Sequence, residues 1–113
     1  MYHYKAILNR IIDGDTIDVM IDLGFGIQIK QRVRLHGINT PETRTLDLEE
    51  KKKGFAARDR LKELLPREFV IETILNKRGK YGRVLGILWV GEENINKKMV
   101  TEGYAKEYNT PTR

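Results

Sequence analysis

Two stretches in the first third of the chain alternate apolar and polar residues with a period of two. They are residues 17–22 (IDVMID) and residues 27–35 (IQIKQRVRL), and the glycine-containing segment 23–26 (LGFG) separates them. Successive side chains of a strand point to opposite faces, so this pattern predicts two half-buried β-strands joined by a turn. The segment 13–16 (DGDT) before them has the composition of another tight turn.

The polarity pattern becomes helical in the middle of the chain. Residues 37–41 end the second strand, because the proline in this segment lacks an N–H group. Residues 43–53 are predicted to form a charged loop, and residues 54–65 a helix that Pro66 terminates. One stripe of this helix is apolar and consists of Ala57, Leu61, Leu64 and Leu65.

Two apolar segments, residues 69–75 (FVIETIL) and residues 84–90 (VLGILWV), flank a turn in the second half of the chain. Both are rich in β-branched and large apolar residues, which favours strands. The turn between them, residues 76–82, is basic, so the pattern predicts a long hairpin with a positively charged tip. Apolar residues recur at helical spacing over residues 95–100, and Gly103 provides a C-terminal cap for a second helix.

The predicted order of elements is several strands, one helix, two strands and one helix. The helices are too few and too late in the chain for a fold of parallel strands joined by crossover helices. The order fits an α+β fold, a five-stranded OB-fold Greek-key β-barrel with two or more appended α-helices. A chain of 113 residues can bury one hydrophobic core but not two, so residues 1–113 are expected to form a single domain.

The chain is basic, and its positive charge is concentrated in two segments. It holds 21 Lys and Arg residues against 16 Asp and Glu residues, a formal net charge of +5, and its isoelectric point is about 9.5. Residues 28–36 (QIKQRVRLH) and residues 76–83 (NKRGKYGR) contain several basic residues and no acidic one. If folding brings them together, they form a surface suited to a polyanion such as nucleic acid. Each is equally compatible with an ordinary solvated face, so charge alone leaves the partner open.

Composition excludes several other classes of function. The sequence has no cysteine, which excludes disulfides, thiolate metal sites and a cysteine nucleophile, and two histidines do not suffice for a histidine-rich zinc cluster. No stretch approaches the roughly 18 consecutive apolar residues of a membrane span, and the N-terminal residues lack the apolar core of a signal peptide. A soluble protein without a membrane partner is therefore expected. Its compartment stays open between the cytoplasm and a mature or excised secreted domain.

Three polar segments together form a candidate site: residues 13–16 (DGDT), residues 34–42 (RLHGINTPE) and residues 80–83 (KYGR). Each alone has an ordinary structural explanation as a turn, a loop opening or a hairpin tip. Together they supply oxygen ligands for a hard cation, a carboxylate that can take a proton from water, and guanidinium groups that bind phosphate bidentately. Phosphodiester hydrolysis requires such groups, because negative charge builds on the phosphate in the transition state.

In order and separation, these segments resemble the signature segments of the staphylococcal nuclease (thermonuclease) family. The resemblance rests on residues 12–16, 34–42 and 80–83, and it continues through residues 95–100 and 103–106, which resemble the next helix of that family. It implies an OB-type barrel with helices and calcium-dependent, sugar-nonspecific hydrolysis of DNA and RNA by attack of water on phosphorus. The expected partner is single-stranded or locally melted nucleic acid, and the protein is expected to be a monomer.

The resemblance assigns roles to nine residues at matching positions of the family's motifs. The calcium ligands that it implies are Asp15, Asn39 and the backbone carbonyl of Thr40, with Asp13 just outside them. The catalytic residues are Arg34 and Arg83, which match phosphate-binding arginines, and Glu42, which matches the residue usually assigned as general base. The nucleotide-binding residues are Lys80 and Tyr81, which match contacts to a terminal phosphate, and Tyr108, slightly out of register with base-stacking tyrosines.

Asn39 departs from the family pattern, which has a second calcium-binding Asp at this position. An amide oxygen can still bind calcium, but the site loses one negative charge and is expected to bind the ion more weakly. This departure supports an alternative function, a catalytically silent OB-fold module that binds nucleic acid or protein through the same basic face. The joint presence of an acidic metal ligand, two arginines and a general base favours the active nuclease instead.

Overall fold

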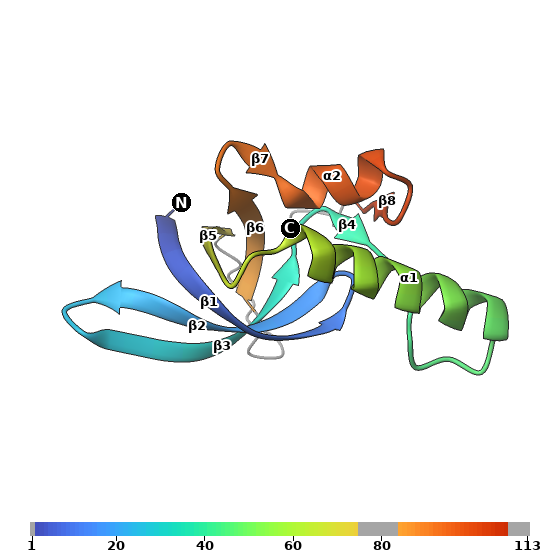
Figure 1. The fold of residues 1–113 in the computed structure, drawn as a ribbon, viewed down its shortest axis with the longest axis horizontal. Coiled ribbons are helices and arrows are strands. Elements are labelled where there is room, and N and C mark those ends of the chain that lie inside the picture. The colour runs from blue at the N-terminus through green and yellow to red at the C-terminus, as the bar shows by residue number, and fades with distance from the viewer. Residues whose placement is uncertain (1, 75–83, 109–113) are drawn as a thin grey trace, which may run out of the picture.

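The computed structural model describes residues 2–74 and 84–108, and a five-stranded β-barrel forms its centre (Figure 1). The barrel strands are β1 (Tyr2–Asp13), β2 (Thr16–Gly24), β3 (Ile27–Leu35), β5 (Glu68–Ile74) and β6 (Val84–Val90). Neighbouring strands pair antiparallel in the order β3-β2-β1-β5-β6, and a parallel pairing of β3 with β6 closes the barrel. The closed barrel with appended helices confirms the fold class predicted from the sequence.

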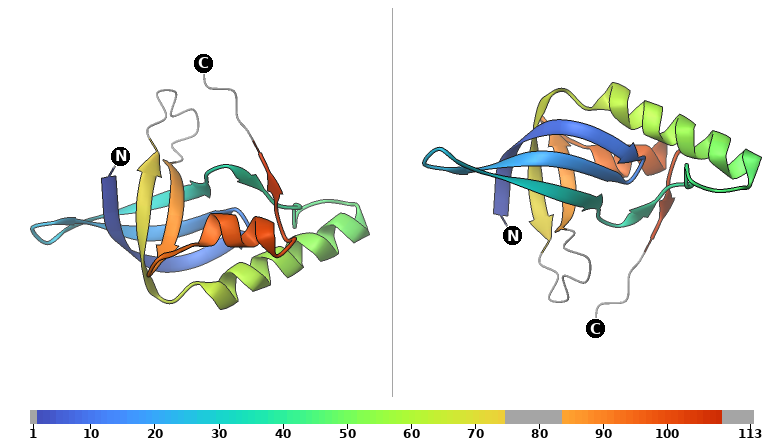
Figure 2. Two further views of the ribbon diagram at one scale, coloured as in Figure 1. Left: turned by 90° about the horizontal axis from the view of Figure 1, so that it is seen from above. Right: turned by 90° about the horizontal axis from the view of Figure 1, so that it is seen from below.

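Among the described residues, two helices and three short strands complete the fold (Figure 2). Helix α1 (Leu48–Leu64) contacts β1, and helix α2 (Ile95–Thr101) contacts β6. Strand β4 (Ile38–Asn39) pairs antiparallel with β8 (Lys106–Glu107), which brings the segment after α2 beside the segment after β3. The third short strand, β7 (Glu93–Asn94), pairs with β6 and leads into α2. None of the helices in the described part of the chain is long and apolar enough to cross a membrane.

The period-two pattern places one face of β2 and β3 in the barrel core. Ile17, Val19 and Val33 are completely buried, and Asp18, Met20, Arg32 and Arg34, which alternate with them, are at least partly exposed. Towards the turn of the hairpin the pattern persists but the burial does not, since Ile27 is 55% and Ile29 is 41% exposed. The second strand is therefore confirmed, but its predicted half-burial is wrong for its first residues, because the barrel ends before this part of the hairpin.

The turn at the end of this hairpin has an unusual residue in it. Phe25 and Gly26 form a two-residue turn, as predicted within residues 23–26, and their φ angles are +55° and +75°. Positive φ at both central residues is the backbone of a type I′ turn, which favours Asn-Gly, Asp-Gly or Gly-Gly. A bulky non-glycine residue in this left-handed region costs on the order of 1 kcal/mol.

Helix α1 begins earlier than the apolar spacing predicts. The predicted loop over residues 43–53 is wrong for its second half, because the helix already starts at Leu48. The side chain of Asp47 caps this end by accepting hydrogen bonds from two backbone N–H groups of the first turn. The first turns show no apolar period because no residue before Gly54 is buried. The predicted C-terminal end is confirmed to within one residue, at Leu64.

Helix α2 confirms the second predicted helix, and Asn96 in its first turn ties three segments together. Gly103 ends this region with a φ angle of +84°, as expected for a cap. Asn96 is 4% exposed, and its Oδ1 accepts a hydrogen bond from the N–H of Leu88 at 3.0 Å. Its Nδ2 donates to the carbonyl oxygens of His36 at 2.9 Å and Gly86 at 3.0 Å. Because His36 directly follows β3, this network fixes the turn between β3 and β4.

Strands β5 and β6 confirm the predicted hairpin of the second half, with an unbroken register from Val70 to Ile74 on β5. Its predicted basic tip, residues 76–82, lies outside the described residues. Strand β1, by contrast, has no counterpart among the elements predicted from the sequence. Its register against β2 shifts twice, once before Arg10 and once before Asp13, and each shift interrupts the alternation that identifies a strand.

Candidate functional site

Asp15 lies in the predicted turn between β1 and β2, where the fold buries its carboxylate. The residue is 7% exposed, and its Oδ2 accepts a hydrogen bond from the backbone N–H of Thr40 at 3.0 Å. Its Oδ1 accepts a second hydrogen bond from Oγ1 of Thr16 at 3.1 Å. The glycine before it is required, because a Cβ atom on Gly14 would lie 2.8 Å from the Cβ of Ala57 on α1. The turn is therefore packed tightly between α1 and the segment that follows β4.

Arg34, near the end of β3, forms an ion pair with Asp15. Its Nη1 lies 3.3 Å from Oδ2 of Asp15 and donates to the backbone carbonyls of Leu35 at 3.2 Å and Ile38 at 3.0 Å. Its Nη2 donates to the side-chain oxygen of Asn39 at 3.2 Å. The two ion-paired side chains, Arg34 and Asp15, are 18% and 10% exposed, so water screens their attraction only weakly. The guanidinium is thereby fixed, while its Nε makes no hydrogen bond within the described chain.

The loop that carries Glu42 is held at three points. The backbone N–H of Glu42 donates to Oε2 of Glu50 on α1 at 3.3 Å. The carbonyl oxygen of Glu42 approaches α1 so closely that a Cβ atom on Gly54 would lie 2.5 Å from it. One residue later, Oγ1 of Thr43 donates to Oδ1 of Asp13 at 2.7 Å. The side chain of Glu42 is exposed, so its carboxylate faces solvent from a backbone that is held in place.

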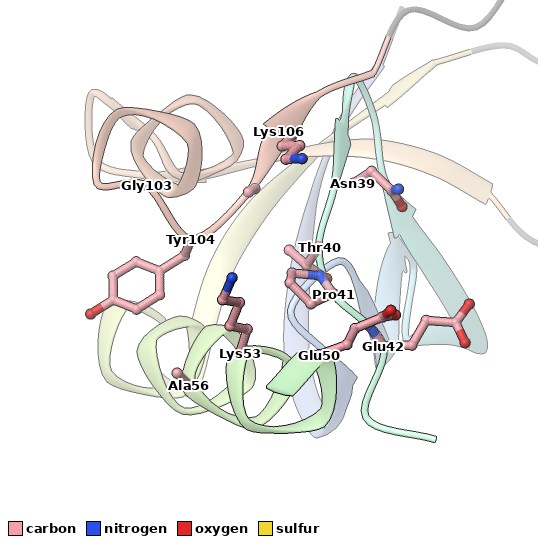
Figure 3. Close-up of a pocket in the computed structure, with 11 residues that line it drawn as sticks. Asn39, Thr40, Pro41, Glu42, Glu50, Lys53, Ala56, Gly103, Tyr104 and Lys106 are labelled. Atoms are coloured by element: carbon pink, nitrogen blue, oxygen red, sulfur yellow. The ribbon is translucent and has the colours of Figure 1, made fainter. Parts of the chain in front are cut away.

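A pocket with a volume of about 640 Å³ adjoins this loop (Figure 3). Asn39, Thr40 and Glu42 contribute to one wall, and α1 and the segment after α2 provide the others. The side chain of Glu42 points away from the centre of the pocket in Figure 3. Asp15 and Arg34 do not line this pocket, but each forms a hydrogen bond with one of its wall residues, Thr40 and Asn39 respectively. The volume is within the range of small-molecule binding sites.

Asp15, Asn39 and Thr40, which contacts link through Arg34 and Asp15, carry oxygen atoms of the types that could hold a hard divalent cation. A carboxylate, an amide oxygen and a backbone carbonyl are ligands of the kind that Ca²⁺ and Mg²⁺ prefer. The Oγ1 of Thr40 is buried and has no hydrogen-bond partner, which leaves one more oxygen uncommitted beside this set. Oδ1 of Asn39 and Oδ1 of Asp15 each accept one hydrogen bond, from Arg34 and Thr16 respectively, and each has a further lone pair. This set contains one carboxylate, that of Asp15. Residues 2–74 and 84–108 contain no group of three or more His, Cys, Asp or Glu that could hold a metal ion.

The structure brings the candidate residues from two of the three predicted segments together. The connected cluster consists of Asp15, Arg34, Asn39 and Thr40. Tyr108 follows β8, which pairs with β4; it is 49% exposed, and its backbone N–H donates to the carbonyl of Gly37 at 2.8 Å. The candidate residues outside the described part of the chain are Lys80, Tyr81 and Arg83.

Two residues that hold the Glu42 loop were not among the predicted site residues. Thr43 binds the turn through Asp13, and Gly54 allows the loop to lie against α1. A glycine inside a helix costs roughly 0.5–1 kcal/mol relative to alanine, so Gly54 carried a signal of close backbone approach. Thr43 carried no such signal, because its partner is 30 residues away in the sequence.

The chain belongs to the staphylococcal nuclease family. The sequence model of the family described as staphylococcal nuclease homologue matches residues 32–113 of the chain. The chain is 38% identical over 104 residues to a thermonuclease of Staphylococcus hyicus and 37% identical over 101 residues to a thermonuclease of Staphylococcus intermedius, which covers 91% and 88% of this chain. It is 35% identical over 121 residues to a micrococcal nuclease of Shigella flexneri, which covers 96% of this chain and 63% of that protein. The chain spans 57% of the length of each thermonuclease.

Replacing Arg34 by Met is expected to lower the free energy of unfolding by roughly 3 kcal/mol, because the nearly buried carboxylate of Asp15 then loses its cationic partner. Urea unfolding followed by circular dichroism measures this change. The control is Arg10→Met, which breaks a more exposed pair with Asp18, with 65% and 18% exposed side chains, and should cost less than about 1 kcal/mol. Equal losses in the two variants would show that the Asp15–Arg34 pair has no special weight in the fold.

Proposed function

We propose that this chain has the activity of a calcium-dependent nuclease, which hydrolyses phosphodiester bonds of DNA and RNA without preference for the sugar. The observation that carries the proposal is the guanidinium of Arg34, which Asp15 and Asn39 fix beside the segment that leads to the exposed Glu42. A preorganised cation near an exposed carboxylate suits a reaction in which negative charge builds on phosphate. The thermonucleases and the micrococcal nuclease among the relatives support the same reaction class.

Glu42 is the proposed general base. Its carboxylate accepts a proton from a water molecule while the oxygen of that water forms a bond to phosphorus and the bond to the leaving oxygen breaks. Arg34 donates N–H groups to the non-bridging oxygens as their charge increases. Arg83, which the family resemblance pairs with Arg34, is proposed to do the same. The hydrogen bond from the backbone N–H of Glu42 to Glu50 supports this role, because a general base acts only when it is held within reach of the proton that it takes.

Asp15, Asn39 and the carbonyl of Thr40 are the residues proposed to hold calcium. When bound, the ion supplies positive charge to the phosphate and a template for the substrate. Because the set contains a single carboxylate, the affinity for calcium should be lower than that of a site with two.

The proposed substrate is a single-stranded or locally melted nucleic acid. The net charge of +5 favours a polyanion, and unpaired bases can stack on aromatic side chains. Lys80 and Tyr81 are proposed to contact a terminal phosphate of the substrate, and Tyr108 a base. The exposure of Tyr108 is compatible with stacking.

A second candidate function is a module that binds nucleic acid or protein without cleaving it. The observation that favours it is Asn39, whose amide oxygen is bonded to Arg34 and carries no charge for a cation. The two candidates differ in one measurable property, which is calcium-dependent turnover.

Cleavage of a plasmid and of an RNA, each with calcium and with a chelator, tests the proposed function. We expect both substrates to be cut with calcium and neither with the chelator. Glu42→Gln should lower the rate roughly 10²- to 10⁴-fold, because an amide cannot take the proton from water. Glu68→Gln removes the same charge from an exposed position on β5 and should leave the rate unchanged. If the wild-type protein cuts neither substrate, the nuclease is excluded and the binding module is the remaining candidate. A fully active Glu42→Gln variant would exclude Glu42 as the base.

Asn39→Asp tests the calcium site through binding as well as through rate. Replacing the amide oxygen by an anionic oxygen is expected to tighten calcium binding by about tenfold, since affinity follows the charge of the ligands. Isothermal titration calorimetry measures the affinity directly, and the half-saturating calcium concentration for cleavage should fall in parallel. Asp15→Asn should shift both values the other way. If neither variant changes the affinity measured by calorimetry, these residues do not contact the ion.

A further inference from the structure

The β2–β3 hairpin continues past the end of the barrel as a two-stranded arm, residues 22–30 (Figures 1 and 2). β2 pairs with β1 only as far as Ile21, and β3 pairs with β6 only from Val33 onward. Within the described chain, the two strands of the arm therefore pair with each other alone. Both figures show the arm pointing away from the N-terminal end of α1 and from the loop before it, which carries Glu42.

Four large apolar side chains of the arm are exposed. They are Leu23 at 41%, Phe25 at 103%, Ile27 at 55% and Ile29 at 41% exposure. Ile27 and Ile29 continue the inner face of the barrel, because Ile29 is paired with the buried Ile21. Single exposed apolar residues are ordinary, but a contiguous group of them indicates an interaction surface. The barrel core does not account for these side chains.

Phe25 gains nothing from the fold at the position it occupies. Its φ angle of +55° in a two-residue turn favours Asn or Gly over an aromatic residue. Its side chain is fully exposed, so no burial offsets this backbone strain. Strain of this kind persists where a function outside the fold requires the residue. The side chain of Phe25 is therefore best explained by a binding partner at the tip of the arm.

The charges of the arm favour an apolar partner over a polyanion. Its ionisable side chains are one acid, Asp22, and one base, Lys30, so its net charge is zero. At the base of the arm, Nε of Arg32 donates to Asp18 at 2.8 Å, and Nε of Arg10 donates to the same carboxylate at 3.3 Å. The hydrogen bond from Arg32 lowers the pKa of Asp18, so this carboxylate stays charged and engages both arginines. Nucleic acid or an anionic bilayer would meet no cluster of uncompensated cations on this arm.

We propose that the arms of two copies of this chain pack against each other and form a dimer. A second arm offers matching apolar side chains and brings no net charge. Burying these side chains removes on the order of 500 Å² from each copy, so the interface totals about 1,000 Å², the lower limit for a specific interface. Because the interface lies at this lower limit, we expect weak and reversible association. The proposed dimer differs from the monomer expected from the sequence.

The proposal is independent of the proposed catalytic function. The arm lies away from the Glu42 loop, so a dimer formed through the arms leaves the candidate site of each copy open. A protein that dimerises without cleaving nucleic acid, and one that cleaves without dimerising, are distinct results of separate measurements.

Sedimentation velocity over a protein concentration range from about 5 to 500 µM, which brackets a micromolar dissociation constant, tests the dimer. The wild-type protein should shift from monomer to dimer as its concentration rises. Phe25→Asn should raise the dissociation constant at least tenfold and raise Tm by a few degrees, because Asn suits the left-handed turn. Ile27→Thr, which keeps a β-branched residue on the arm, should also weaken association. The control is Leu46→Asn, which removes an apolar side chain with 100% exposure from the loop before α1 and should leave association unchanged.

Three results would overturn the proposal. The first is a wild-type protein that stays monomeric over the whole range of concentrations. The second is a Phe25→Asn variant that associates like the wild type. If the Tm of this variant also falls, Phe25 stabilises the folded protein instead of binding a partner. The third is a monomeric wild-type protein whose affinity for a single-stranded oligonucleotide falls in Phe25→Asn, which would make nucleic acid the partner of the arm.

Discussion

The ion pair between Asp15 and Arg34 determines how the rim of the barrel is arranged. A carboxylate as buried as that of Asp15 requires a cationic partner and hydrogen bonds, since an isolated buried charge is strongly unfavourable. Arg34 provides the cation from the end of β3, and the backbone N–H of Thr40 provides a hydrogen bond from the segment after β4. Satisfying one charge therefore joins the β1–β2 turn, the end of β3 and the segment that leads to Glu42.

Close packing against α1 completes this arrangement. Two glycines make it possible, because Cβ atoms on Gly14 and Gly54 would meet α1 and the Glu42 backbone at less than 3 Å. The contacts that position Glu42 are thus contacts that also stabilise the fold. For this reason, the stability of the protein and the function proposed for it depend on the same few residues, and substitutions among them need a measurement of folding beside each measurement of activity.

Sequence patterns were informative wherever one local rule dominated. The alternation over residues 17–22 identified β2 because Ile17, Val19 and Ile21 all lie in the core, and Pro66 marked the end of α1 correctly. The patterns were uninformative where the surrounding fold, and not the local sequence, determined the start of a helix or the burial of a strand. The start of α1 extends beyond the core and so shows no apolar period, and the alternation of residues 27–30 predicted a burial that the barrel is too short to provide. The motifs identified the family and the cluster around Arg34, but not the long-range bond of Thr43 that holds the Glu42 loop.

The cleavage rate of Arg34→Lys, measured in a single turnover at saturating calcium, tests the central claim most directly. Lysine keeps a positive charge for Asp15 but lacks the planar pair of donors that can grip a phosphate at two points. The account predicts a rate at least about a hundredfold below that of the wild type, in a variant that circular dichroism shows to be folded because lysine keeps the positive charge that Asp15 requires. A folded lysine variant that cleaves at nearly the wild-type rate would contradict the account, because the fixed guanidinium would then have no part in the reaction.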